Sequence, residues 1–108
     1  MGLPITIEPA PGRYRVSIGD ITLGETAAAV MLHETGHGPV LYVPRADMDM
    51  ALFTSTDRSS TCPWKGQASY FSVGGQNNVV WSYERPIDAV ARIAGYLAFY
   101  PAVTVEKV

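Results

Sequence analysis

Hydrophobic and polar residues alternate along much of this chain, which is the pattern of strands that are buried on one face. The alternation is clearest in residues 5–8 and 14–23. A Gly19-Asp20 pair, of the type that closes hairpins, divides the second of these segments. We therefore expect residues 1–12 to form an N-terminal arm or edge strand, followed by a β-hairpin.

The second half of the chain predicts a longer hairpin and one helix. Residues 64–73 and 79–84 have the composition of its two strands, and residues 74–78 that of its loop. After Pro86, apolar residues recur at helical spacing until Gly95. We therefore expect one short helix in the C-terminal half.

Three further segments complete the fold prediction. Residues 26–32 fit either a helix or a strand, and the strands on both sides favour a strand. Residues 45–52 predict a short helical turn, and the polar residues 54–60 predict a turn. Together these patterns predict a mostly β domain of twisted antiparallel sheets.

Length and composition fit a single domain. A chain of 108 residues with 47% hydrophobic residues can bury one core, so we treat residues 1–108 as one domain with its core in 13–108. Charged residues make up 17% of the chain, below the usual quarter or so, which is compatible with a homodimer that covers part of the surface. A net charge of −2 attracts no phosphate backbone, so we expect no nucleic-acid partner.

The cysteine count and the absence of long apolar segments bear on location. Cys62 is the only cysteine, so neither an internal disulfide nor a multi-cysteine zinc site can form. The chain has neither the basic and apolar start of a signal peptide nor the roughly 20 apolar residues that span a bilayer. We expect a cytoplasmic protein with no membrane partner and no cofactor.

The long hairpin carries the candidate site. If residues 74–78 form the loop and Val73 pairs with Val79, one face carries a cation, an amide and hydroxyls beside aromatic rings. Such a face suits a small ligand with an anionic group. A shift of one residue in the pairing would move the rings of β-strand residues 81 and 83 to the opposite face. The predicted face consists of Lys65, Gln67, Ser69, Phe71, Trp81 and Tyr83.

A simpler interpretation remains open for the same residues. The aromatic rings can fill the core while Lys65 reaches solvent along its aliphatic stem. Cys62, three residues before Lys65, is either a nucleophile stabilised by the ammonium or a small apolar residue.

The stretch from His33 to His37, His-Glu-Thr-Gly-His, matches the His-Glu-x-x-His pattern of zinc proteases. That pattern works on a helix, which places both imidazoles on one face with the glutamate, here Glu34, as general base. Gly36, Gly38 and other turn-forming residues oppose such a helix here. A zinc-dependent hydrolase is therefore an alternative function without its usual structural context.

Several motifs follow one another in order along the chain: Glu34-Thr35-Gly36, Pro39-Val40-Leu41-Tyr42-Val43-Pro44, Asp47, Cys62-Pro63-Trp64-Lys65-Gly66, Ala68-Ser69-Tyr70, Trp81-Ser82-Tyr83, Pro86, Ile93-Ala94-Gly95-Tyr96 and Ala98-Phe99-Tyr100. From about Tyr14 to the end of the chain, this order resembles the family catalogued as domain of unknown function 427. The family carries a nucleotidyltransferase-like label, but no paired aspartates follow a glycine-serine turn here.

This resemblance implies a fold and strengthens the candidate site. The implied fold is similar to the β-tent architecture of methionine sulfoxide reductase B, in which ligands bind in a groove between sheets. The zinc-binding cysteine pairs of several β-tent proteins are absent here. The residues that match the family motif include more lysine, acid and tyrosine than a core needs: Glu34, Tyr42, Asp47, Cys62, Lys65, Gly66, Tyr70, Trp81 and Tyr83.

Our functional prediction combines both lines of reasoning. We expect a pocket in which Lys65 binds a small anionic ligand and in which Glu34 or Asp47 serves as general base if the protein is an enzyme. The other predicted ligand-binding residues are Gln67, Ser69, Trp81, Tyr83 and Tyr42. The alternative from another class is a non-catalytic interaction or dimerisation module whose aromatic residues form the interface.

Overall fold

The computed structural model describes residues 5–108 and is mostly β, as the sequence predicted. The first four residues of the predicted N-terminal arm lie outside the described residues. The strands are β1 (Ile5–Pro9), β2 (Tyr14–Ile18), β3 (Ile21–Thr26), β4 (Val30–Glu34), β5 (Val40–Tyr42), β6 (Phe53–Cys62), β7 (Gly66–Val73), β8 (Gln76–Ser82), β9 (Leu97–Phe99) and β10 (Thr104–Lys107). The helical turns are η1 (Arg45–Asp47), η2 (Met50–Leu52) and η3 (Asp88–Ile93).

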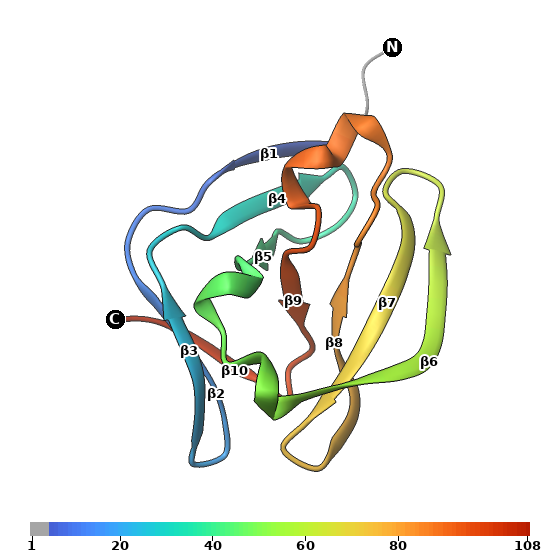
Figure 1. Ribbon diagram of the computed structural model, residues 1–108. Coiled ribbons are helices and arrows are strands. Elements are labelled where there is room, and N and C mark those ends of the chain that lie inside the picture. Colours follow the sequence, from blue (N-terminus) through green and yellow to red (C-terminus); the bar gives the residue numbers. More distant parts are fainter. Residues whose placement is uncertain (1–4) are drawn as a thin grey trace.

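The strands form three antiparallel sheets, with the orders β1-β4-β5, β10-β2-β3 and β6-β7-β8-β9. In Figure 1 the four-stranded sheet lies on the right and the two three-stranded sheets lie on the left. Single β-bridges, Val43 with Leu97 and Gly24 with Met48, join the sheets to one another and to the segment that contains η1. The predicted hairpin at Gly19 is confirmed as β2–β3.

The β7–β8 hairpin pairs in a register one residue away from the predicted one, so that prediction was wrong. Tyr70 lies opposite Trp81, whereas the sequence placed Phe71 there. Because side chains alternate between faces, the shift moves Trp81 and Tyr83 to the face of β7 that carries Ala68 and Tyr70. The two rings therefore lie on the opposite face of the hairpin from the one predicted.

Turn chemistry explains the shift. Gly74 and Gly75 both have positive φ values, 58° and 78°, and form a two-residue turn that pairs Val73 with Gln76. A bulge follows, at which Asn78 also has a positive φ of 55°. The sequence prediction treated all five residues of this segment as loop and so missed both the tight turn and the bulge.

The predicted C-terminal helix is shorter and tighter than expected. The segment between Pro86 and Gly95 forms η3, a 3₁₀ helix whose backbone is irregular at Val90 (φ −123°, ψ 28°). The backbone N–H groups of Ile87 and Gly95 both donate to the hairpin region, at Lys65 and Tyr83, on either side of η3. These fixed ends favour a short, tight helix over the α-helix that the spacing predicted.

Of three other segments, one differs from the prediction and two agree with it at least in part. Residues 54–60, predicted as a turn, lie within the edge strand β6, where exposed polar side chains do not oppose strand formation. Residues 45–52 form the two short turns η1 and η2. The strand favoured for residues 26–32 is confirmed in its second part, because β4 begins at Val30.

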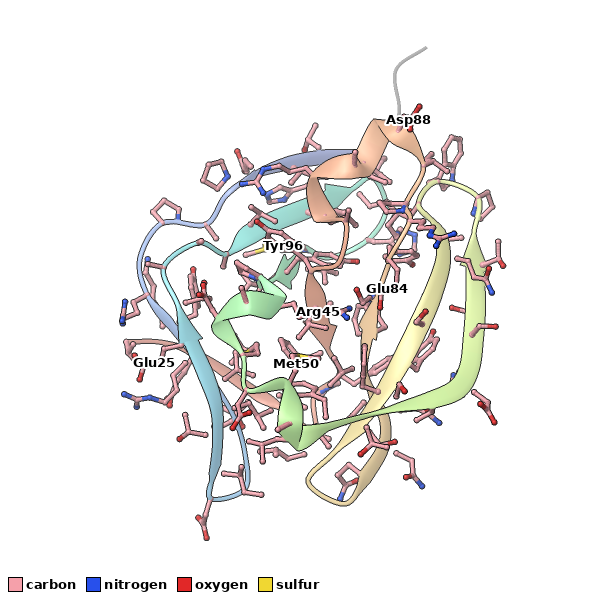
Figure 2. The ribbon with its side chains drawn as sticks, in the orientation of Figure 1. Glu25, Arg45, Met50, Glu84, Asp88 and Tyr96 are labelled. Atoms are coloured by element: carbon pink, nitrogen blue, oxygen red, sulfur yellow. The ribbon has the colours of Figure 1, made fainter. Side chains whose placement is uncertain are left out.

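Arg45 links three parts of the chain near the centre of the molecule (Figure 2). Its Nε donates to the carbonyl oxygen of Gly95 at 3.2 Å, and its Nη2 donates to Ser82 Oγ at 3.2 Å and to Glu84 at 2.8 Å. The guanidinium thereby ties η1 to the end of β8 and to the turn after η3. Hydrogen bonds from a charged guanidinium to several acceptors fix geometry as well as adding energy.

Buried side chains form two hydrophobic clusters, one on each face of the β7–β8 hairpin. The first cluster consists of Ala10, Val16, Ile18, Leu23, Ala29, Val43, Met48, Phe53, Phe71, Val73, Val79, Val80, Leu97 and Val103. The second cluster consists of Val30, Leu32, Tyr42, Ala68, Tyr70, Tyr83, Val90, Ile93 and Ala98, with Trp81 and Cys62 packed against it.

Candidate functional site

A cleft of about 520 Å³ opens beside the second cluster, between the β1-β4-β5 sheet and the β6–β9 sheet. This volume falls within the usual range for small-molecule sites. Other hollows lack comparable chemistry: one of about 560 Å³ along β6 and the β7–β8 turn has Asp57 as its one charged side chain. The cleft is lined by Leu32, Glu34, His37, Gly38, Val40, Tyr42, Thr61, Cys62, Pro63, Trp64, Lys65, Tyr70, Trp81, Tyr83 and Tyr100.

The turn between β6 and β7 fixes the position of Lys65. Its N–H donates to the carbonyl oxygen of Cys62 at 3.1 Å, and its own carbonyl oxygen accepts from the N–H of Ile87 at 3.0 Å. Gly66 follows with a φ of 113°, a conformation that side-chain-bearing residues rarely adopt. Both backbone groups of Lys65 are therefore held, and its side chain projects into the cleft.

Lys65 and Glu34 form a largely buried ion pair in the cleft. Lys65 Nζ lies 2.7 Å from Glu34 Oε1, and the two side chains are 11% and 14% exposed. The ammonium also lies 5.8 Å from the centre of the Tyr83 ring. Burial alone lowers the pKa of Lys65, but the hydrogen bond to Glu34 and nearby negative charges together outweigh it and raise that pKa. Lys65 therefore carries its proton at neutral pH.

Two tyrosines of the cleft also keep their protons. Burial raises the pKa of Tyr42 to about 12, against a smaller opposing effect from the indole N–H of Trp81, which donates to the hydroxyl at 3.3 Å. Burial also raises the pKa of Tyr83 to about 12, and the nearby Lys65 charge opposes it only partly. Both hydroxyls are therefore hydrogen-bond donors at neutral pH.

The hydroxyl of Tyr83 is available to a ligand. Tyr83 is only 6% exposed, and no hydrogen bond joins its hydroxyl to another side chain or to the backbone within residues 5–108. No fully buried polar atom in that range lacks a partner, so this oxygen retains some exposure to the cleft that the residue lines. A buried donor without a protein partner is a natural contact for a ligand.

Aromatic rings form the rest of the wall. The Trp81 and Tyr100 rings lie 4.7 Å apart between centres, and Tyr42 meets Trp81 edge to face at 6.4 Å. Trp64 and Tyr100 remain 44% and 41% exposed at the cleft. These rings present flat apolar surface on which a ligand can stack.

The structure brings together most of the predicted site residues but not all of them. Five line one cleft: Lys65, Glu34, Tyr42, Trp81 and Tyr83. The other three predicted residues, Gln67, Ser69 and Asp47, do not line it.

The reasons for these exceptions are local. Gln67 and Ser69 alternate with Ala68 and therefore lie on the face of β7 that points away from the second cluster. Asp47, in η1, accepts a hydrogen bond from the hydroxyl of the buried Thr26 at 2.7 Å. Asp47 thus fixes the turn after β5, whereas Glu34 is the carboxylate that reaches Lys65 Nζ.

The cleft residues that the sequence prediction did not assign to the ligand site include His37, Trp64 and Tyr100. Tyr100 reaches the cleft because β9 pairs with β8, a long-range contact that no local pattern signals. Trp64 precedes Lys65 directly in the sequence, and this position was the one sequence feature that could have indicated its place in the cleft.

The two histidines do not adopt the zinc-protease arrangement. His33 and Glu34 are neighbours on β4, so their side chains point to opposite faces, and His33 Nε2 lies 2.9 Å from Glu8 Oε1. His37 follows a turn, with Nε2 3.9 Å from Glu34 Oε2. Within the described part of the chain, no three His, Cys, Asp or Glu side chains gather as metal ligands would.

The arrangement can orient a polar group and exclude much of the water around it. Lys65, Tyr42 and Tyr83 offer donors, Glu34 offers an acceptor, and the rings cover apolar surface.

Among residues 5–108, none of the helices has the length and hydrophobicity of a membrane-spanning helix.

Comparison with known families agrees with the motif order noted in the sequence. A family model described as Domain of unknown function (DUF427) matches residues 6–108. No curated protein matches the chain. Because the family model covers almost the whole sequence, the chain belongs to the domain of unknown function 427 family.

Proposed function

We propose that this protein binds a small ligand with an anionic group in the cleft, and that Lys65 contacts that group. The observation that carries the proposal is the gathering of a buried ammonium and two protonated tyrosine hydroxyls in one aromatic-walled cleft. Donors that converge from separate strands favour a ligand rich in acceptor oxygens, such as a carboxylate. Glu34 holds the ammonium in place.

The geometry of the ion pair leaves Lys65 able to bind. An ammonium has three N–H donors, and Glu34 accepts from it at 2.7 Å through one oxygen. The remaining donors are free to meet an oxygen of a ligand that stacks on Trp81. If the protein also catalyses a reaction, Glu34 is our candidate general base, because it is the one Asp or Glu side chain of the described residues that lines the cleft.

Calorimetric titration with nucleotides, sugar phosphates and carboxylic acids tests this proposal. A compound present at 100 times its dissociation constant should stabilise the wild type by about 2.7 kcal/mol in thermal unfolding. Lys65→Met should weaken binding by at least about tenfold, because it removes the cation and keeps the stem. Lys107→Met, the same change at the exposed end of β10, is the matched control. Unchanged binding by Lys65→Met would disprove the role of the cation.

A second candidate is a homodimer, favoured by the exposure of Trp64 and Tyr100 at the edge of the cleft. Exposed aromatic residues that lie close together are typical of interface surfaces. Sedimentation of wild type and Trp64→Ser distinguishes the two candidates. A dimer that dissociates in the variant supports an interface, and a monomeric wild type rejects it.

We also propose a cytoplasmic location. The single free Cys62 fits a reducing compartment and contributes no disulfide to stability. Fractionation of cells that produce the untagged protein would test this assignment.

A further inference from the structure

The charge balance of the cleft restricts the kind of ligand that it favours. Within residues 5–108, Lys65 is the one Lys or Arg side chain that lines the cleft, and Glu34 is the one acidic side chain. The pair is neutral as a whole, and His37, whose imidazole also lines the cleft, is 69% exposed to solvent. A simple anion would add an uncompensated charge to a site walled by aromatic rings, which is costly. A ligand that carries one positive and one negative charge adds no net charge to the cleft.

Both members of the pair have unused hydrogen-bonding positions. Glu34 Oε1 accepts from Lys65, whereas Oε2 accepts no hydrogen bond within residues 5–108, and His37 Nε2 lies 3.9 Å from it. Lys65 retains donors of its own, and the hydroxyl of Tyr83 is unpartnered in the same range. A carboxylate fits the donors, and an ammonium fits the free oxygen of Glu34.

A groove of about 340 Å³ lies next to the cleft. Val40, Trp81 and Tyr100 line both hollows, so the two are adjacent. Among residues 5–108, no Lys, Arg, Asp or Glu side chain lines the groove. The other residues of the groove are Pro39, Leu41, Phe99, Pro101, Val103 and Val105.

From these three features we propose that the ligand is a zwitterionic α-amino acid with an apolar or aromatic side chain, a claim that rests on the proposed function. Its carboxylate meets Lys65 and the Tyr83 hydroxyl, and its ammonium meets Glu34. In an α-amino acid both charged groups and the side chain are attached to one carbon. The side chain therefore leaves the ion pair and runs along Trp81 towards the groove.

A set of three compounds tests the need for both charges. Phenylalanine, 3-phenylpropanoate and phenethylamine share one aromatic side chain and differ in their charged groups. In calorimetric titration of the wild type, phenylalanine should bind at least about tenfold more tightly than either of the others. Among glycine, alanine and leucine, affinity should rise by up to about fourfold for each buried CH₂.

Variants assign each charge to its partner. Glu34→Gln should remove the preference for phenylalanine over 3-phenylpropanoate, and Lys65→Met should weaken the binding of both acids. Glu106→Gln, on the exposed strand β10, should leave the preference intact. The compound series on the wild type still decides the matter if a variant does not fold.

The outcomes separate this inference from the proposed function. If 3-phenylpropanoate binds the wild type as tightly as phenylalanine, or phenethylamine binds most tightly, the zwitterion is disproved. In the first of these cases an anion-binding cleft still stands. If no compound with an anionic group binds, both the proposed function and this inference fail.

Discussion

The two faces of the β7–β8 hairpin contact two clusters of different chemical character. Phe71 and Val80 on one face join the first cluster, whose members are all apolar and largely sealed from solvent. Tyr70 and Tyr83 on the other face join the second cluster, which ends at the cleft. One hairpin therefore contributes both a core and a candidate site, because its side chains alternate between the two.

The polar atoms of the second cluster explain why it carries the site. A buried tyrosine or tryptophan brings a hydroxyl or N–H that needs a partner, whereas a valine or leucine brings none. Trp81 meets Tyr42, and Tyr70 shares a hydrogen bond with Ser60 at 2.7 Å. Tyr83 has its hydroxyl at the cleft. The first cluster contributes to stability through apolar packing alone. The second cluster contains less purely apolar surface and more hydrogen-bonding groups.

Alkaline pH should weaken the second cluster most. Tyr42 and Tyr83 have folded-state pKa values of about 12, above the ordinary 10.0 of the unfolded chain. As pH rises from 10 towards 12, the unfolded state loses these protons first, so the stability present below pH 10 falls. By pH 12 the loss should reach about 2 kcal/mol for Tyr42 and less for Tyr83, whose hydroxyl is partly screened by the solvent of the cleft.

Urea unfolding at several alkaline pH values, together with tyrosinate absorbance, measures this effect. Tyr83→Phe should lose less stability than the wild type over the same pH range. An equal loss in both proteins would show that Tyr83 titrates normally.

Truncation in the first cluster should give a change of comparable size. Leu97→Ala removes a side chain that is 0% exposed and should cost about 2–5 kcal/mol, because a cavity remains. Ile87→Ala, at a position 38% exposed, should change stability by less than about 0.5 kcal/mol. Denaturant unfolding gives both values. Ligand affinity of the folded Leu97→Ala protein should match that of wild type, and a large loss of affinity would contradict the division between the two faces.

The smallest expected changes in stability come from removing the hydroxyl of either of two tyrosines in the second cluster, Tyr42 or Tyr83. Tyr42→Phe should cost about 1 kcal/mol, because the indole N–H of Trp81 loses its acceptor. Tyr83→Phe should leave stability at neutral pH nearly unchanged, because its hydroxyl has no protein partner to lose within the described residues. Ligand affinity should instead fall in Tyr83→Phe. If Tyr83→Phe lost more stability than Tyr42→Phe in denaturant unfolding, the hydroxyl of Tyr83 would have the structural role, and this prediction would be wrong.

Local pattern was sufficient for much of the fold. Alternation predicted the β2–β3 hairpin, and its Gly19 turn needs only neighbouring residues. The register of β7–β8 failed because it depends on a turn of Gly74 and Gly75 and on a bulge at Asn78. These features change the register without changing the hydrophobic pattern on which the prediction relied.

The sequence by itself identified the ionisable residues of the candidate site. Lys65 and Glu34 were identified from charge and motif, since few ionisable side chains occur among the apolar residues of this chain. Only the tertiary structure decided that these two residues, 31 positions apart, meet at 2.7 Å while Asp47 turns to Thr26. The physical reason is that strand pairing between distant segments sets which face each side chain occupies, and no local pattern contains that information.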